Sequence, residues 1–283
     1  MEKPDVSIIV PTYNSGKTLA ECLASIENQT YPSCEVVIVD NFSNDTTLEI
    51  AKEFKAKMLR RKSNAALARN IGVANSIGQY VLFLDSDQVL SPTVVEECVE
   101  KCKKEKAEMV RIPETFIGKG FWGYCSAVWK NYYQKAEQLY GATKNILSGE
   151  PRFFVREQIN RVGMFDITLI WGEDYDLHER LKAVNAKEAM CASSVYHYEL
   201  ASLRGILAKN LHYGRYMPAF IRQAQKHILS LMVRHALLTL REVSRDFRKS
   251  PATIVGCVIL LCLKAYTIIV GSTAGFSAEA SRR

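Results

Sequence analysis

The stretch VLFLDSDQVLSP, residues 81 to 92, joins an apolar run to a pair of acidic side chains. The four apolar residues Val81 to Leu84 predict a buried strand, which ends abruptly in Asp85, Ser86 and Asp87. Two carboxylates separated by one residue repel each other, and the apolar run draws them toward a low dielectric constant, where charge is costly. A divalent cation removes this conflict, and carboxylate oxygens suit Mg²⁺ or Mn²⁺, which also bind phosphate oxygens.

The position of these acids after a strand also carries information. Open α/β sheets bind their ligands beyond the carboxyl ends of the strands. The stretch therefore predicts a metal and diphosphate site. The alternative is structural, since a strand can end in a polar turn in which an Asp caps the next helix.

Composition and charge separate the chain into two parts. Its 283 residues, 48% of them hydrophobic, suffice for one large domain or for a domain with an appendage. Residues 201–283 hold 13 Lys or Arg and 3 Asp or Glu, a net charge of +10, whereas the rest of the chain has a net charge of −3. A slightly acidic domain is thus followed by a basic segment, which points to an anionic surface, either a membrane or nucleic acid.

The eight cysteines form no CxxC pair and no zinc-like spacing. Cys98 and Cys102 are four apart in an expected helix, where packing or a metal role are the two interpretations. Scattered cysteines are typical of a reducing compartment. The first residues, MEKPDVSIIVPTYN, lack the pattern of a signal peptide, so we expect the first 200 residues to be cytosolic.

The beginning of the chain predicts a right-handed βαβ unit. Val6–Val10 is a short apolar strand stopped by Pro11, residues 17–29 form an amphipathic helix, and Val36–Val39 is a second strand that ends in Asp40. The first turn, PTYNSG, has one glycine only, so it lacks the cradle for a dinucleotide pyrophosphate. This argues against an NAD enzyme and leaves a mononucleotide held by an Asp and a tyrosine ring.

A small-residue helix leads into the central strand. Another helix is expected over residues 46–54, and the stretch 60–80 follows it. Arg69 stands there among Ala65, Ala66, Ala68 and Gly72, whose small side chains allow a close approach of the backbone. The arginine predicts an anion contact, or else it is a solvated residue on a helix face.

Three stretches in this order, VSIIVPTYN, VVIVDNFSNDTT and NAALARNIGVANSIGQYVLFLDSD, resemble the inverting glycosyltransferase family two. The resemblance continues through residues 153–165 and Gly172-Glu173-Asp174, and it covers about residues 5 to 200. The chain departs from the family at Asn41 and Phe42, where many members have Asp and Gly. The resemblance implies an α/β GT-A fold, a Rossmann-like mixed sheet, for a catalytic domain of residues 1–200.

The resemblance also implies roles for single residues. The expected donor nucleotide contacts are Pro11, Tyr13, Asn14, Asp40, Arg69, Asp85 and Ser86. The expected ligands of Mn²⁺ or Mg²⁺ are Asp85, Asp87 and His197, although a lone histidine can also be structural. Asp174 is expected to be the catalytic base, because the acceptor hydroxyl loses a proton as it attacks, and Glu173 is expected to orient it. The structural alternative is that Glu173, Asp174 and Asp176 stabilise a helix amino terminus.

The remaining elements of the catalytic domain are expected from simple patterns. A helix over residues 91–104 begins at Ser91 and Pro92, and Met109–Ile112, Phe153–Val155 and Val195–Tyr198 are expected strands. Residues 114–148 are rich in aromatic side chains and are expected to be irregular. These aromatic side chains form either an acceptor wall or ordinary core packing.

The basic segment predicts membrane attachment. Residues 203–249 alternate basic and apolar side chains, which is typical of helices in a membrane interface, and Pro218 is expected to break them. Residues 251–276 are long and apolar enough to cross a bilayer. Lys264 in their middle costs ~2.5–3.5 kcal/mol at the centre of a spanning helix. A tilted, re-entrant or spanning helix and an interfacial helix are therefore both open.

These observations together predict a metal-dependent hexosyltransferase at the cytoplasmic face of the cell membrane. We expect a GDP- or UDP-sugar donor, with mannose slightly favoured over another hexose or N-acetylhexosamine, and a polyprenyl- or dolichyl-phosphate-linked acceptor. Nucleic acid is not expected as a partner, because no recognisable module accompanies the basic residues. The alternatives are a nucleotidyltransferase, for which PTYNSGK is a poor signature loop, and a non-catalytic membrane-surface binding module.

Overall fold

The computed structural model describes residues 4–54, 56–140, 151–218, 228–246 and 250–280. The chain forms two compact units. The first unit consists of residues 1–115, 149–168 and 173–197, and the second consists of residues 116–148, 169–172 and 198–283. The expected boundary near residue 200 lies close to the end of the first unit, but residues 116–148 belong with the C-terminal segment by their contacts.

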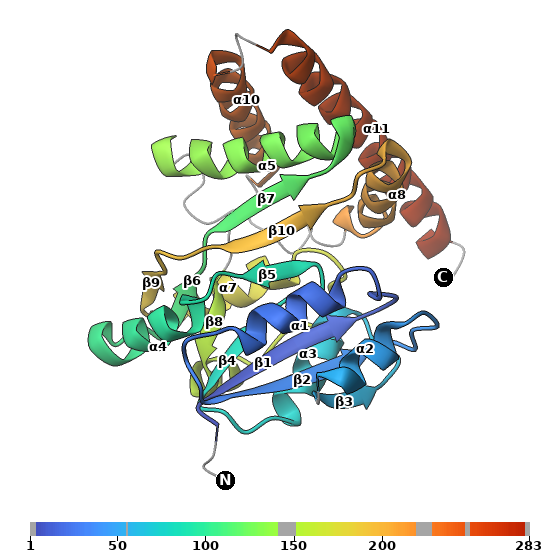
Figure 1. Cartoon of the computed structure of the whole chain (residues 1–283). Coiled ribbons are helices and arrows are strands. Elements are labelled where there is room, and N and C mark those ends of the chain that lie inside the picture. The colour runs from blue at the N-terminus through green and yellow to red at the C-terminus, as the bar shows by residue number, and fades with distance from the viewer. Residues whose placement is uncertain (1–3, 55, 141–150, 219–227, 247–249, 281–283) are drawn as a thin grey trace. The chain divides into compact units, whose positions relative to one another are not determined.

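The first unit is built on a mixed seven-stranded sheet (Figure 1). Its strands, in spatial order, are β3 (Lys57–Arg60), β2 (Cys34–Asp40), β1 (Val6–Thr12), β4 (Tyr80–Phe83), β8 (Pro151–Val155), β6 (Met109–Arg111) and β9 (Glu188–Met190). Strands β3, β2, β1 and β4 are parallel to one another, and β8 is antiparallel to both β4 and β6. Because β1 and β4 run side by side in the same direction, the turns after Thr12 and after Phe83 lie at the same edge of the sheet.

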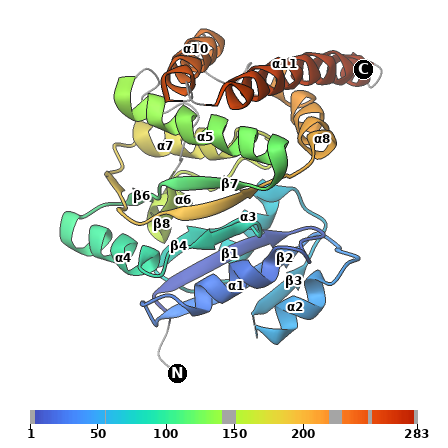
Figure 2. The ribbon, with the colours of Figure 1, turned by 45° about the horizontal axis from the view of Figure 1, so that its top comes forward.

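Helices cover both faces of this sheet, as Figures 1 and 2 show from two directions. The alternation along β1 sets the two layers, since Ile8 and Val10 face one hydrophobic cluster and Ile9 faces the other. Helices α1 (Leu19–Glu27), α2 (Thr47–Glu53) and α4 (Val94–Glu105) pack on the first face. Helices α3 (Ala65–Ala74), α6 (Arg156–Arg161) and α7 (Glu173–Ala183) pack on the second.

Helix α3 approaches the sheet closely because of its small residues. A Cβ atom on Gly72 would lie 2.2 Å from Cγ2 of Ile9 on β1, so only glycine fits at this crossing. The helix begins at Asn64, whose side chain accepts a hydrogen bond from the backbone N–H of Leu67 at 2.8 Å. This close packing confirms the expected use of the small residues and fixes the backbone that carries Arg69.

A smaller three-stranded sheet has the order β5 (Gln88–Leu90), β10 (Val195–Glu199) and β7 (Glu114–Gly118). Strand β5 follows the Asp85-Ser86-Asp87 turn directly. It pairs antiparallel with β10, and His197 stands opposite Gln88 in the register. This pairing brings His197 to the end of the Asp85-Ser86-Asp87 turn, although the two are far apart in the sequence.

The second unit is helical. Its described helices are α5 (Gly120–Tyr140), α8 (Leu203–Gly214), α10 (Ile228–Asp246) and α11 (Pro251–Ala280). Their common core is a cluster of buried apolar side chains from all four helices: Cys125, Val128, Trp129, Ile206, Val243, Cys257 and Leu260. The described helices include one, over Pro251–Ser272, that is long and apolar enough to cross a membrane by length and composition.

Several expected elements were wrong in their extent. Strand β1 continues through Pro11 to Thr12, because its pairing with β4 ends at Ile9 and Phe83, so that no further ladder bond to β4 is needed at the proline. Residues 114–140 are not irregular but form β7 and the long helix α5, in which aromatic side chains such as Trp129 serve the helical core. Residues 141–148 lie outside the described residues.

The basic segment also differs from its expected form. Helix α8 already ends at Gly214, before Pro218, and Met217 and Pro218 are themselves helical. The next long helix, α10, is described over Ile228–Asp246. Residues 219–227 and 247–249, which contain part of the expected helix, lie outside the described residues. The apolar helix α11 extends to Ala280, beyond the expected residue 276.

Candidate active site

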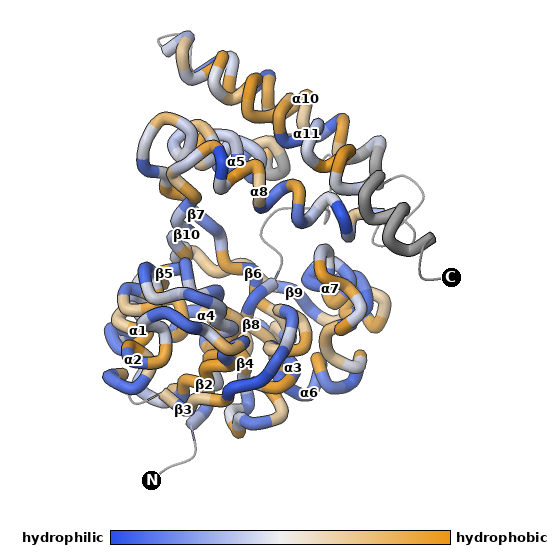
Figure 3. The backbone as a smooth tube through the Cα atoms, turned by 90° about the vertical axis from the view of Figure 1, so that its right-hand side faces the viewer, coloured by the Kyte–Doolittle hydropathy of each residue, from blue (hydrophilic) through white to orange (hydrophobic). Residues whose placement is uncertain are grey.

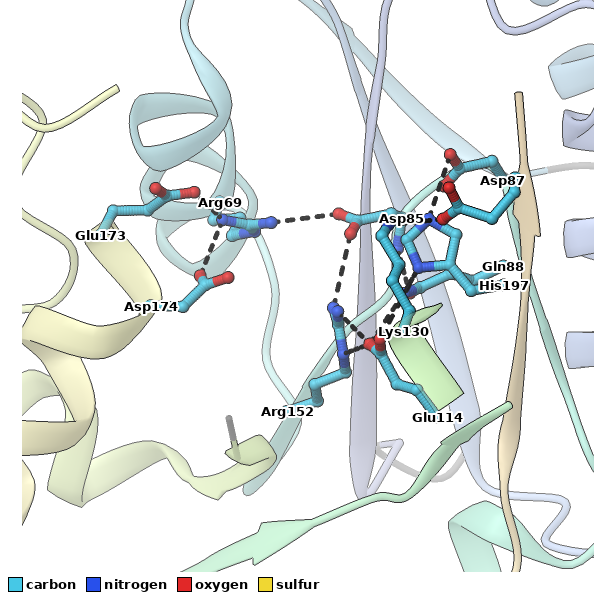
Figure 4. A network of polar contacts seen from close by, with 11 residues as sticks. Arg69, Asp85, Asp87, Gln88, Glu114, Lys130, Arg152, Glu173, Asp174 and His197 are labelled. Atoms are coloured by element: carbon cyan, nitrogen blue, oxygen red, sulfur yellow. Dashed lines mark hydrogen bonds and ion pairs between the residues drawn. The ribbon is translucent and has the colours of Figure 1, made fainter. Parts of the chain in front are cut away.

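Asp85 lies between two arginines at the end of β4 (Figure 4). Its Oδ1 is 3.0 Å from Nη2 of Arg69 on α3, and its Oδ2 is 3.5 Å from Nη1 of Arg152 on β8. Burial raises the pKa of Asp85, but the charges of Arg69 and Arg152 outweigh it and hold that pKa well below its usual range. The conflict between the two carboxylates expected from the sequence is therefore relieved in part by arginine, before any cation is considered.

Asp87 points the other way, toward His197 (Figure 4). Its Oδ2 is 3.4 Å from Nε2 of His197, and Nδ1 of the same ring is 3.7 Å from Oε2 of Glu114. Burial disfavours the imidazolium, but Asp87 and Glu114 outweigh it and raise the pKa of His197 to about 9. The histidine is thus oriented by one carboxylate and presents its other nitrogen to the second.

Arg69 also reaches the two acids at the start of α7. Its Nη1 donates to Oε1 of Glu173 at 2.8 Å and to Oδ1 of Asp174 at 3.0 Å. The arginine side chain is 5% exposed and Glu173 is 12% exposed, whereas Asp174 is 38% exposed. Burial and the neighbouring Asp174 charge raise the pKa of Glu173 above its usual range, although Arg69 opposes them.

The structure thus brings four expected site residues into direct contact through one guanidinium group: Arg69, Asp85, Glu173 and Asp174. Three separate elements supply them, because α3 carries the arginine, Asp85 follows two residues after the end of β4, and α7 begins at the two remaining acids. A group of alternating charge at the carboxyl ends of strands is a typical ligand site of an α/β sheet.

Asp40, the acid expected to bind a ribose, is fully buried. Its Oδ1 accepts hydrogen bonds from the hydroxyl of Thr12 at 3.0 Å and from the hydroxyl of Ser43 at 2.5 Å, and its Oδ2 accepts one from the N–H of Ser43 at 3.0 Å. Arg60 adds an ion pair at 3.7 Å. In this structure Asp40 fastens the loop after β2 to the end of β1, and its contact with a nucleoside stays a prediction.

The other expected nucleotide residues lie in the loops around Asp40. Tyr13 is 64% exposed. Pro11 is half-buried in the last part of β1. Asn14, at a φ of 50°, connects the two loops by accepting a hydrogen bond from the N–H of Asn44. The hydroxyl of Ser86 is 2.7 Å from that of Ser15, so the Asp85-Ser86-Asp87 turn is held against the first loop.

Sequence reasoning missed several residues that complete the site. Arg152 pairs with Asp85 and also with Glu114, which is 7% exposed. Gln88, fully buried, accepts a hydrogen bond from the N–H of Asp85 at 3.0 Å and donates one to Glu114 at 3.2 Å. Arg152 stands directly before the expected strand Phe153–Val155, and Glu114 begins the stretch that was expected to be irregular, so strand alternation assigned neither residue to a site.

One further residue was noted in the sequence only as a departure from the family. Phe42 is 54% exposed at a φ of 54°, a backbone conformation that a bulky side chain rarely adopts. The guanidinium of Arg60 lies 4.9 Å from the centre of its ring. An exposed aromatic residue in a strained conformation, two residues after the buried Asp40, marks this loop as a candidate surface for a planar ligand group.

The donor atoms at Asp87 and His197 fit a divalent cation. Neighbouring ligands of a six-coordinate Mg²⁺ or Mn²⁺ lie ~3 Å apart, and the carboxylate oxygen and Nε2 are 3.4 Å apart. Glu114 on the far side of the ring is the outer partner that metal-binding histidines usually have. Within the described part of the chain, no three His, Cys, Asp or Glu side chains form a metal site by themselves.

Comparison with known proteins connects this site to a family. The family model described as "Glycosyl transferase family 2" matches residues 7–163, more than half of the chain. A relative in Streptococcus pneumoniae, Glycosyltransferase GlyA, is 30% identical over 69% of this chain and 30% of its own length. Poly(ribitol-phosphate) beta-N-acetylglucosaminyltransferase TarP of Staphylococcus aureus is 36% identical over 41% of this chain and 38% of its own length. The chain thus matches only about a third of the length of these curated relatives.

Solved structures share the fold at lower identity. The mannosyltransferase PcManGT from Pyrobaculum calidifontis, in complex with GDP-Man and Mn²⁺, has a TM-score of 0.62 at 19% identity and covers 98% of this chain and 88% of its own. Residues 1–349 of TarS from S. aureus, in complex with UDP-GlcNAc, have a TM-score of 0.56 at 18% identity over 99% of this chain and 92% of theirs. These similarities confirm the expected GT-A fold. With the sheet, the acidic strand end and the matched residues 7–163, they establish that the chain belongs to glycosyltransferase family 2.

Proposed function

We propose that the protein is an inverting glycosyltransferase that moves a sugar from a nucleoside-diphosphate sugar to a lipid-linked acceptor at a membrane. One observation carries the proposal. Arg69 joins the acid at the end of β4, Asp85, to the acids at the start of α7, Glu173 and Asp174. A donor-side acid and an acceptor-side acid held by one cation are the arrangement that a direct displacement needs, with the nucleotide on one side and the attacking hydroxyl on the other.

The donor side comprises the loops after β1, β2 and β4. Tyr13 is exposed and available to a nucleobase. Asn14 and Ser86 connect the loops by hydrogen bonds, and the buried Asp40 accepts a hydrogen bond from Ser43 in the loop after β2. Asp87 and His197 would hold Mn²⁺ or Mg²⁺, with Asp85 nearby. When bound, such a cation neutralises negative charge on the leaving diphosphate.

The acceptor side comprises the first turn of α7. Asp174 is more exposed than Glu173, so its carboxylate can reach the hydroxyl of an acceptor and take up the proton as the hydroxyl attacks. Its hydrogen bond from Arg69 fixes its direction. Glu173 lies deeper and holds the same guanidinium, which makes it an orienting residue.

The solved neighbours and the second unit support the proposed donor and acceptor classes. The neighbours in complex with GDP-Man and with UDP-GlcNAc support a GDP-mannose donor or a UDP-linked hexose or N-acetylhexosamine, and we favour mannose. The apolar helix over Pro251–Ser272 and the net charge of +10 in residues 201–283 support a location at the cytoplasmic face of the membrane. An acceptor on a polyprenyl or dolichyl phosphate fits that location.

The test is sugar transfer by the full chain from GDP-mannose and from UDP-GlcNAc to dolichyl phosphate in detergent, with Mn²⁺. We expect Asp174→Asn to lower kcat by roughly 10²–10⁴-fold while the donor still binds, because the amide cannot take up a proton. The matched control is Asp176→Asn, since Asp176 is two residues away and pairs with Arg180 at 2.7 Å. Equal effects of the two variants on kcat would contradict the proposed role of Asp174.

A further inference from the structure

Helix α11 presents an apolar face outward, and the lysine that interrupts its apolar sequence, Lys264, lies on the inward side. Its exposed positions recur every three or four residues, as on one side of a helix: Val255, Val258, Ile259, Cys262, Ala265, Tyr266, Ile269 and Val270. In Figure 3 this helix, which leads to the C-terminal end, is coloured mostly as hydrophobic. A helix on the surface of a water-soluble unit normally has the opposite pattern, with polar side chains outward.

The inward face of α11 holds the polar groups. Nζ of Lys264 is 3.2 Å from the hydroxyl of Ser126 on α5, and that hydroxyl donates to Oε2 of Glu199 at 2.8 Å. Lys130 pairs with the other oxygen of Glu199 at 2.5 Å. The lysine that interrupts the apolar sequence is therefore directed into the helical unit, where a carboxylate balances its charge.

Contacts fix α11 to its neighbours at both ends. A Cβ atom on Gly256 would lie 2.6 Å from Sγ of Cys125 on α5, and a Cβ atom on Gly271 would lie 2.6 Å from the carbonyl oxygen of Leu211 on α8. These two glycines are 15 residues apart in the sequence, so the packed length of the helix is about 22 Å. Over this length one side of α11 contacts protein. The other side carries the exposed apolar positions from Val255 to Val270 named above, which together form an apolar stripe.

The helices around α11 are basic and exposed. Helices α8 and α10 carry exposed basic side chains, and so does the C-cap residue after α8. These residues are Arg204, Lys209, Arg215, Arg234, Arg241 and Arg245. Two acids of the same unit, Glu199 and Glu242, have side chains only 8% and 6% exposed. An apolar stripe in a unit with this charge matches a surface of anionic lipids, in which basic side chains meet headgroups and apolar ones enter the hydrocarbon.

We propose that α11 lies in the plane of the membrane surface with its apolar stripe inserted, and that it does not cross the bilayer. This inference rests on the membrane location in the proposed function. If α11 crossed, α8, which is packed against its C-terminal half, would enter the hydrocarbon with Arg204 and Lys209. If α11 lies in the plane, its stripe faces the lipid along the whole length, and Lys264 stays on the protein side.

The orientation is measurable by depth-dependent fluorescence quenching. Tryptophan is introduced along the stripe as Val255→Trp, Cys262→Trp or Ile269→Trp, and each full-length variant is bound to vesicles of phosphatidylcholine and phosphatidylglycerol brominated at different acyl positions. The quenching of the native tryptophans in the wild type is subtracted. We expect the three positions to have the same shallow depth. A residue-262 probe much deeper than both flanking probes would indicate a spanning helix and would overturn the proposal.

A second variant pair tests what covers the stripe. The double variant Val255→Glu, Ile269→Glu is compared with Ile77→Glu, an equally exposed apolar position of the first unit (53%). We expect the double variant to lose at least tenfold in vesicle affinity, and the control to bind like the wild type. If the double variant instead binds vesicles normally and changes from dimer to monomer in sedimentation, a second copy covers the stripe and the proposal is wrong.

Nucleotide binding distinguishes a failure of the transferase site from a failure of the membrane location or of the in-plane orientation of α11. Both variants and the wild type are titrated with GDP and UDP in the presence of Mn²⁺. If the wild type binds nucleotide but no vesicles, the membrane location fails together with this inference, and the transferase site stands. If it binds vesicles and the three depths differ, only the in-plane orientation fails.

Discussion

At the scale of single residues, the site depends on charges that are shared among several partners. The two terminal nitrogens of Arg69 contact three carboxylates, while its Nε is buried with no hydrogen-bond partner among the described residues. A lysine at this position would supply one point charge, and could not reach acids on different elements with separate nitrogens. The guanidinium group therefore lowers the pKa of Asp85 and sets the direction of both Asp85 and Asp174.

The carboxylate of Glu97 on α4 holds a loop in place and takes no part in the proposed reaction. It accepts hydrogen bonds from the backbone N–H groups of Ala192 and Ser193, at 3.0 and 2.9 Å, and from the hydroxyls of Thr93 and Ser193. Burial raises the pKa of Glu97, but the bonds from Ser193 and Thr93 outweigh it and lower the pKa from 4.5 to about 2. This carboxylate fastens the segment before β10, the strand that carries His197.

The depressed pKa predicts a pH-dependent stability. A group whose pKa is lower in the folded state stabilises the protein above its unfolded-state pKa, and this contribution is lost as the pH falls toward the folded value. We therefore expect Glu97→Gln to lower the melting temperature at pH 7, and the gap to the wild type to narrow below about pH 4.5. Thermal unfolding from pH 7 to pH 3 measures the effect.

The matched control is Glu100→Gln on the same helix. Glu100 forms an exposed pair with Lys104 one turn away, and such pairs contribute little to stability. The Glu100→Gln substitution removes the same charge as Glu97→Gln but none of the hydrogen bonds to the loop. If Glu97→Gln lowers the melting temperature no more than Glu100→Gln does, or by an amount that does not change with pH, the role assigned to Glu97 is wrong.

At the scale of elements, short helices present the site by their first two turns. Helix α3 carries Arg69 in its second turn, and α7 begins directly at Glu173. Each helix must therefore begin at the right residue if these side chains are to meet. The start of α3 is set by Asn64, which accepts from Leu67 N and also donates through Nδ2 to the carbonyl of Ile167 at 2.8 Å.

Removal of this cap should weaken the helix. We expect Asn64→Ala to lower the free energy of unfolding by about 1 kcal/mol, because a helix N–H loses its partner, and to lower kcat as Arg69 becomes less fixed. Urea unfolding with parallel assays measures both. The control is Asn28→Ala at the exposed C-cap of α1, expected within about 0.5 kcal/mol of the wild type. A stable Asn64→Ala variant would show that the start of α3 is set by its packing on β1 alone.

At the scale of the whole molecule, the sequence predicted the fold class and the order of the elements well. Periodicity identified the buried strands, and the acids after Leu84 marked the edge of the sheet at which the candidate site lies, because burial and charge in adjacent residues are a local signal. Contacts between distant segments were less accessible. The pairing of Asp87 with His197 depends on the register of β5 with β10, and the pairing of Asp85 with Arg152 depends on where β8 enters the sheet.

The helical unit was harder to predict than the sheet. Its aromatic helix α5 has no clean apolar stripe, since it contacts other helices on more than one side, so residues 120–140 suggested irregular structure. The apolar sequence of α11 was consistent with a spanning or an interfacial helix, and Lys264 did not decide between them. The contacts of Gly256, Lys264 and Gly271 and the burial of Cys257 and Leu260 indicate which face of α11 is inward.

The central claim is that the end of β4 is a metal-dependent nucleotide site, and calorimetric titration of the full chain with GDP and with UDP tests it most directly. We expect one nucleotide to bind tightly with Mn²⁺ and at least tenfold more weakly without it. We also expect Asp87→Ala to remove the metal dependence while the protein stays folded. If neither nucleotide binds to the folded protein with Mn²⁺ present, Asp85 and Asp87 form a structural turn and the proposed nucleotide site is wrong.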